Sequence, residues 1–181
     1  MEIRFHSRGG EGAVSACEML VGAFTKEGKY ASGFPMFGFE RRGAPVTAFL
    51  RYSDQPIREK TMIYNPDCLI ISDRYQVDSP MSYAGFRSRG ILVANSRQPL
   101  EKKPNDNVKI VGTVDATEIA LTEIGVLAVN SCLMGSFAAV TGWLQLESIL
   151  WALEKRFEGD LLRKNIRSVE RGFSEVKIFE Y

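Results

Sequence analysis

Cysteine, histidine and excess charge are scarce in this sequence, and each scarcity excludes a class of protein. The 181 residues contain one histidine and three cysteines, without a Cys-x-x-Cys pair. The local ligand spacing of a zinc site or an iron–sulfur cluster is therefore missing. We expect Cys17, Cys68 and Cys132 to be buried and reduced. The formal net charge of +1 provides no global attraction to nucleic acid or to an anionic membrane.

Long apolar stretches are also missing. No window approaches the length that spans a bilayer, and the first residues lack the apolar core of a signal peptide. We therefore expect a cytoplasmic protein with neither a membrane nor a nucleic acid as partner. No Gly-x-Ser-x-Gly elbow is present, and the lone His6 fits a hydrogen-bonded structural residue better than a general base. The residues predict no catalytic group and no metal ligand in this chain.

Apolar strands that alternate with helices dominate what is present. The hydrophobic content of 45% is enough for one ordinary domain with a core. This alternation predicts an α/β fold: a single Rossmann-like domain over residues 1–181, with a mostly parallel sheet and helices on both faces. The expected strands are 2–5, 30–34, 46–52, 68–73, 91–95 and 108–112, and the expected helices are 13–28, 116–123, 130–141, 146–157 and 159–175.

Two segments, 6–13 and 34–45, combine glycines with arginines. Glycines let a backbone approach another molecule closely, and guanidinium groups pair with carboxylate or phosphate. Both segments follow predicted strands, so their loops can converge at one edge of the sheet. Asp73 follows another buried strand, where it could serve function or cap the next turn. The candidate site residues are Arg8, Gly9, Gly10, Gly12, Arg41 and Arg42.

The first segment also resembles part of a dinucleotide fingerprint, but the match is incomplete. Gly10 and Gly12 supply the first two glycines, whereas Ser15 stands in place of the third. Glu11 would compete with a phosphate for the positive end of the following helix. Tight packing of strand against helix is the simpler explanation for these glycines. For any one arginine, the simpler alternative is a solvated surface or an ion pair with Glu11 or Glu40.

Three segments together resemble the gamma subunit, or gamma domain, of the 2-oxoacid:ferredoxin oxidoreductases, a family that includes pyruvate, 2-oxoisovalerate, phenylglyoxylate and oxalate enzymes. They are His6-Ser7-Arg8-Gly9-Gly10-Glu11-Gly12-Ala13, the segment from Phe34-Pro35 to Arg41-Arg42-Gly43-Ala44-Pro45-Val46, and Asn130-Ser131-Cys132-Leu133-Met134-Gly135-Ser136-Phe137. Shorter matches, including Asn65-Pro66-Asp67 and Val114-Asp115-Ala116-Thr117, extend the similarity over the whole chain.

This resemblance implies a subunit that does not act alone. Enzymes of this family cleave a 2-oxoacid oxidatively with thiamine diphosphate and Mg²⁺, and pass electrons through 4Fe–4S clusters to ferredoxin or another acceptor. Most of them transfer the acyl group to coenzyme A and release CO2. The resemblance places these cofactors in thiamine-binding alpha and beta subunits and in a ferredoxin-like delta subunit or domain. It implies that the gamma domain binds none of them itself and helps to frame the access path of coenzyme A.

Two residues depart from the usual first motif of that family, His-Gly-Arg-Gly-Gly-Gln-Gly. Ser7 replaces a glycine, and Glu11 replaces a glutamine with an acceptor-only anion. Glu11 would oppose the phosphates of coenzyme A unless Arg8 or Arg41 neutralises it, so an oxalate-type enzyme that forms no acyl-CoA is an alternative. Two others come from different classes: a free-standing nucleotide-binding domain and a purely structural scaffold.

Overall fold

The computed structural model describes residues 1–36 and 43–181. The elements lie in the order β1 (Glu2–Arg8), α1 (Ala13–Lys26), β2 (Tyr30–Met36), β3 (Pro45–Ser53), β4 (Cys68–Ile71), α2 (Arg74–Val77), a 3₁₀ helix (Pro80–Tyr83), β5 (Gly90–Asn95), β6 (Val108–Val114), α3 (Ala116–Glu123), α4 (Asn130–Thr141), α5 (Leu146–Arg156), α6 (Gly159–Glu175) and β7 (Lys177–Glu180).

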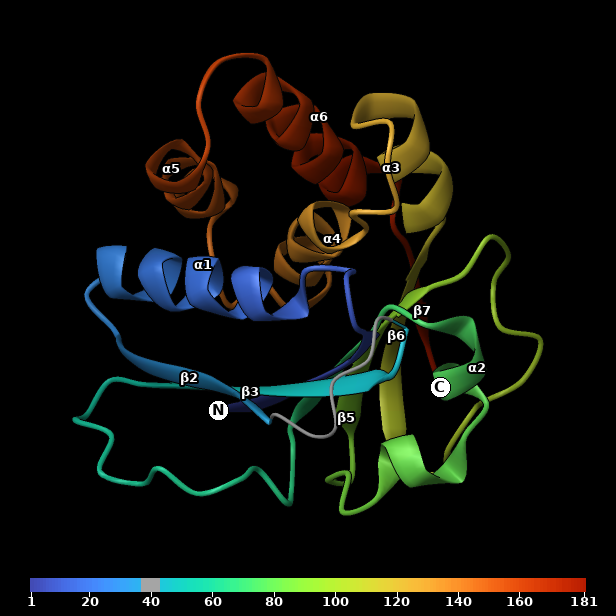
Figure 1. Cartoon of the computed structure of the whole chain (residues 1–181). Coiled ribbons are helices and arrows are strands. Elements are labelled where there is room, and N and C mark those ends of the chain that lie inside the picture. Colours follow the sequence, from blue (N-terminus) through green and yellow to red (C-terminus); the bar gives the residue numbers. More distant parts are fainter. Residues whose placement is uncertain (37–42) are drawn as a thin grey trace.

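The strands of these described residues form one seven-stranded sheet in the order β2-β3-β1-β4-β5-β6-β7 (Figure 1). Its centre, β1-β4-β5-β6, is parallel, and β4 is buried along its whole length, as expected for a strand covered on both faces. The outer pairs β2-β3, β3-β1 and β6-β7 are antiparallel. The predicted α/β fold is therefore confirmed, with antiparallel strands added at both edges.

The core lies in two layers, one on each face of the sheet. On one face, α1 and the helices α3 to α6 pack over Ile3, Phe5, Ile70 and Val93 (Figure 1). On the other face, α2, the 3₁₀ helix and their loops cover a smaller cluster that includes Leu69 and Leu92. Alternate residues of one strand face opposite layers, because side chains in a strand point to opposite faces of a sheet.

The helix pair α4 and α6 packs backbone against backbone. A Cβ atom added at Gly135 would overlap the carbonyl oxygen of Val169, and one added at Gly172 would overlap that of Cys132. The Ser136 hydroxyl also donates to the carbonyl of Gly172 at 2.8 Å. The predicted buried helix 130–141 is confirmed, and its small residues set this close approach.

Two buried arginines fasten the β3–β4 and β4–β5 connections to the sheet. Arg4, on β1, donates to the carbonyls of Ile63, Ser82 and Ala84 at 3.4, 2.9 and 2.9 Å. Arg51, on β3, donates to the carbonyl of Thr61 at 2.6 Å. It also forms an ion pair with the carboxylate of Glu2, on β1, at 2.7 Å. Buried carbonyls need partners, and a guanidinium can serve several at once.

Candidate functional site

The two glycine- and arginine-bearing segments meet at one edge of the sheet. The Gly9 N–H donates to the Ala44 carbonyl at 2.8 Å, and the Gly43 N–H donates to the Gly9 carbonyl at 3.1 Å. Arg8 adds a hydrogen bond from Nη1 to the carbonyl of Gly43 at 3.3 Å. Since β2 and β1 run in the same direction, both loops leave the sheet at the same end. The expected convergence of these loops is confirmed for the described residues.

This edge is a switch point of the sheet. The chain leaves β1 toward α1, on one face, and leaves the adjacent β4 toward α2, on the other face. Divergent connections from neighbouring parallel strands open a crevice beyond their carboxyl ends, where α/β proteins commonly bind ligands. Arg8 and Glu11 come from the β1 side of this crevice, and Ser72 and Asp73 from the β4 side.

Arg8 pairs with a buried carboxylate across the crevice. Its Nε lies 2.7 Å from Oδ2 of Asp73, whose side chain is 8% exposed, whereas the Arg8 side chain is 42% exposed. The other oxygen of Asp73 accepts from the Tyr75 N–H at 3.2 Å and so caps α2. The Arg8 guanidinium also lies 5.8 Å from the centre of the Tyr75 ring. Its Nη2 donates no hydrogen bond within the described residues and can serve an external anion.

Glu11 turns back into its own loop. Its Oε2 accepts from the Arg8 N–H at 2.9 Å, from the Ser7 hydroxyl at 2.8 Å and from the Ser72 hydroxyl at 2.5 Å. Ser7 and Glu11, the two residues that depart from the family motif, are therefore hydrogen-bonded to each other. Three donors stabilise this carboxylate inside the loop, which weakens its opposition to an anion outside.

A double-mutant cycle on Ser7 and Glu11 tests this bond. The S7A and E11A variants should each lower the free energy of unfolding by about 1–2 kcal/mol, because each leaves a partner in the loop unsatisfied. The double variant should lose less than the sum of the two, with a coupling of about 1 kcal/mol in urea unfolding. Additive losses would show that the two side chains act independently.

Glycine is required at the start of α1 for conformational reasons. Gly10 and Gly12 adopt φ values of 96° and 85°, in the left-handed region that L-residues avoid. Gly12 is the N-cap of α1, where it supplies no side chain to the helix amides. The Asn130 side chain, at the start of α4, lies 3.5 Å from the position of a Gly12 Cβ. Gly9 acts through its two backbone hydrogen bonds.

Arg41 and Arg42 lie outside the described residues. Met36 and Gly43, which flank the undescribed segment, are at the same edge as Arg8. Sequence reasoning assigned no role to Ser72, although a polar residue directly after a buried strand is the signal that identifies such positions. Asp73, noted as either functional or a cap, is a cap that also holds Arg8.

His6 is held as a neutral hydrogen-bond acceptor. Its Nε2 accepts from Nε of Arg4 at 3.0 Å. Burial, and secondarily the positive charge of Arg4, lowers the pKa of His6 to about 4. The imidazole is therefore uncharged at neutral pH, with its proton on Nδ1, and it stands in the structural role that the sequence favoured.

The three cysteines are buried thiols. Burial raises the pKa of Cys17 and of Cys132 to about 12, and that of Cys68 further. Within residues 1–36 and 43–181, no group of three or more histidine, cysteine or acidic side chains is placed to hold a metal ion. Among the helices of those same ranges, none has the length and apolar content to cross a bilayer.

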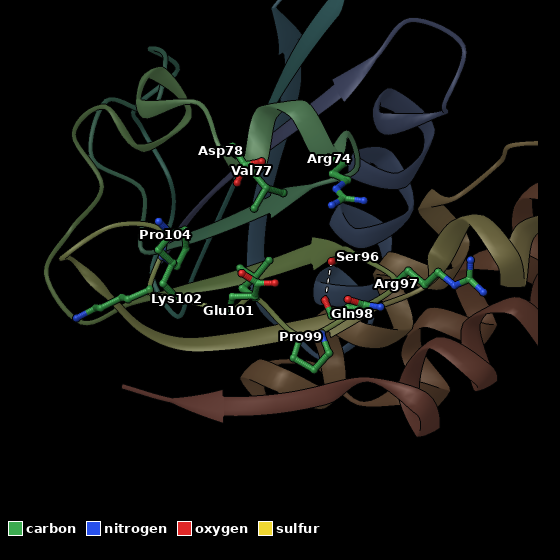
Figure 2. Close-up of a pocket in the computed structure, with 12 residues that line it drawn as sticks. Arg74, Val77, Asp78, Ser96, Arg97, Gln98, Pro99, Glu101, Lys102 and Pro104 are labelled. Atoms are coloured by element: carbon green, nitrogen blue, oxygen red, sulfur yellow. Dashed lines mark hydrogen bonds between the residues drawn. The ribbon is translucent and has the colours of Figure 1, made fainter.

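A separate cavity of about 650 Å³ lies between α2 and the connection that follows β5 (Figure 2). Its lining carries four cationic side chains and two carboxylates: Arg74, Arg97, Lys102, Lys103, Asp78 and Glu101. Arg74 projects toward Ser96, whereas Arg97 and Lys102 point away from the centre of the cavity (Figure 2). Donors that diverge cannot hold one anion together, so the crevice at Arg8 is the better candidate site.

Comparison with known proteins gives consistent matches over the whole chain. The model of a family described as pyruvate ferredoxin/flavodoxin oxidoreductase matches residues 2–175. The pyruvate/ketoisovalerate oxidoreductases common subunit gamma of Thermococcus kodakarensis is 43% identical over 99% of both chains. The NADH-dependent phenylglyoxylate dehydrogenase subunit gamma of Aromatoleum evansii is 45% identical over 98% of this chain and 94% of its own.

The fold has a close counterpart among solved structures. The pyruvate oxidoreductase subunit PORC of Thermotoga maritima superposes with a TM-score of 0.89 at 38% identity, over 99% of this chain and 98% of its own.

Proposed function

The chain belongs to the pyruvate ferredoxin/flavodoxin oxidoreductase family, and on that premise we propose that its switch-point crevice is where coenzyme A and the partner subunits meet it. The relatives are gamma and PorC subunits of 2-oxoacid oxidoreductases, so the chain works as part of an enzyme rather than alone. The observation that carries the proposal is Arg8, a half-exposed guanidinium fixed by Asp73 at the junction of two glycine-bearing loops.

The donor set suits a phosphate group of coenzyme A. Arg8 is oriented by its bond to Asp73 and retains an unused Nη2 among the described contacts. Arg41 and Arg42, in the second loop, are proposed as further cationic partners. Gly9, Gly10 and Gly12 leave room for close approach to the backbone. Since Glu11 is bonded within its loop, we favour coenzyme A as cosubstrate over an oxalate-type enzyme.

The remaining parts of the reaction belong to other chains in this proposal. Thiamine diphosphate with Mg²⁺ supplies the chemistry that cleaves the 2-oxoacid, on alpha and beta subunits, and 4Fe–4S clusters on a delta subunit or domain carry electrons to ferredoxin or another acceptor. The contribution of this chain, a single gamma domain over residues 1–181, is to hold subunits together and to orient coenzyme A. We propose the cytoplasm as its compartment.

Replacement of Arg8 in the assembled complex tests this proposal. The R8A variant should raise KM for coenzyme A about tenfold, since a hydrogen bond to a charged group contributes about 1.5–3 kcal/mol, with little change in KM for the 2-oxoacid. The R8K variant should recover part of the loss because it keeps the charge. R163A serves as the matched control, since Arg163 is an exposed arginine on α6.

The outcomes separate the three hypotheses. R8A could instead lose assembly while KM for coenzyme A stays unchanged in the complex that remains. The crevice would then be a docking surface for partner subunits and not a coenzyme A site. If R8A changed neither the assembly of the complex nor KM for coenzyme A, a scaffold that touches no ligand at this site would be favoured. Tight calorimetric binding of NAD, FAD or ATP by the isolated chain would instead support a free-standing nucleotide-binding domain.

A further inference from the structure

The strand β7 forms an open edge of the sheet. Among the described residues it pairs with β6 on one side only, and all four of its own residues are exposed. Large apolar side chains at this edge are exposed to solvent: Ile178 by 49%, Phe179 by 36% and Tyr181 by 41%. The opposite edge, β2, contains Pro35, which has no N–H to donate and so discourages pairing. Of the two edges, β7 is the one open to another strand.

The pairing of β6 with β7 determines which backbone groups face outward. The Tyr181 N–H donates to the Lys109 carbonyl at 2.9 Å, and the register places Phe179 opposite Val111. In an antiparallel pair, hydrogen-bonded positions alternate along the strand. Lys177 and Phe179 therefore bond to β6, as Tyr181 does. The N–H and C=O groups of Ile178 and Glu180 point to the free side.

We propose that β7 pairs with β7 of a second copy of this chain, with a two-fold axis at Phe179. A strand and its own copy related by a two-fold axis run antiparallel. The outward groups of the two copies must face each other, and an axis at Phe179 meets this condition by bringing Ile178 opposite Glu180 of the second copy. Phe179 then lies opposite Phe179 at a non-hydrogen-bonded position, where side chains are closest and aromatic pairs are favourable.

The side chains of β7 are complementary to a second copy in this register. Lys177 lies opposite Tyr181 of the other chain, an arrangement that suits a cation–π contact. Each strand carries one cation and one anion, Lys177 and Glu180, and Glu180 also pairs with Lys109 of β6 at 3.5 Å, so no uncompensated carboxylate lies at the edge. A register centred on Glu180 would instead place two carboxylates face to face.

Disulfide trapping tests the register. Phe179→Cys places two thiols opposite each other across the axis, and mild oxidation of the full chain should yield a covalent dimer on a non-reducing gel. Ile178→Cys is the matched control, because it faces Glu180 rather than itself and should cross-link at least tenfold more slowly. The three natural cysteines are buried and leave the background low. Equal or faster cross-linking at position 178 would overturn the proposed register.

Sedimentation equilibrium tests the dimer without oxidation. The unmodified chain should show a concentration-dependent dimer that Ile178→Pro dissociates, because this substitution removes an outward N–H that β6 does not use. Circular dichroism of this variant should match the parent, since the β6–β7 hydrogen bonds remain. A chain that stays monomeric at all concentrations, or a dimer that persists in Ile178→Pro, would contradict the proposal. This inference does not depend on coenzyme A binding at Arg8.

Discussion

The R4M variant should lose about 3–4 kcal/mol of unfolding free energy. Arg4 is 8% exposed, and its guanidinium serves three backbone carbonyls from two connecting segments, as well as the ring of His6. Methionine fills much of the volume but leaves these acceptors without a donor, at about 1–3 kcal/mol for each buried group that water cannot reach. Urea unfolding followed by circular dichroism measures the loss.

A second arginine provides the control for this prediction. Arg87 makes two ion pairs, with Glu2 and Asp67, but its side chain is 52% exposed. R87A should cost less than about 1 kcal/mol, because solvent screens exposed pairs. R4K should remain well below the parent, since an ammonium cannot reach all the acceptors of a guanidinium fork. An R4M variant within about 1 kcal/mol of the parent would show that the connection is held by other contacts.

The G135A and G172A variants should each lower stability by about 3 kcal/mol. A methyl group at either position meets a backbone carbonyl of the facing helix, which cannot move aside as a flexible side chain would. The helices α4 and α6 must separate, and overpacking of this kind costs about 1–3 kcal/mol or more. Thermal unfolding of each variant, followed by calorimetry, measures the change.

The matched control lies in α1. A Cβ at Gly22 would have only the Trp151 ring within reach, at an ordinary contact distance of 3.9 Å. G22A should therefore be neutral or stabilising by about 0.5–1 kcal/mol, since alanine is the better helix former. If G135A and G22A behaved alike, the close approach of α4 and α6 would not be a determinant of stability.

Much of the fold is predictable from sequence because local patterns suffice for it. Continuous apolar runs predicted β4, β5 and β6, and helical periodicity predicted α1 and the helices from α3 onward. Asp115 directly precedes the expected helix 116–123, a position at which aspartate is a favourable cap, and its side chain accepts the Glu118 N–H at 3.0 Å. The short strand Lys177–Glu180 was missed, because four exposed residues carry no periodic signal.

The candidate site was only partly predictable. Arg8, Gly9, Gly10 and Gly12 are candidates because of their residue types and their place after a strand, and their functional role stays a prediction. The partner of Arg8 could not be chosen from the sequence: Glu11 is three residues away, yet the guanidinium pairs with Asp73, 65 residues further along. Parallel pairing of β1 with β4 brings Asp73 to the crevice, and such pairing depends on contacts between distant segments.

The class of fold, the family and the candidates Arg8, Gly9, Gly10 and Gly12 follow from the sequence alone, because they depend on local pattern and on motifs. The arrangement of the side chains around them follows from the folded chain. It turned Glu11 inward onto Ser7 and Ser72, oriented Arg8 with Asp73, and left β7 as an open edge. Hydrogen-bond partners and solvent exposure depend on the pairing of strands, which no single segment specifies.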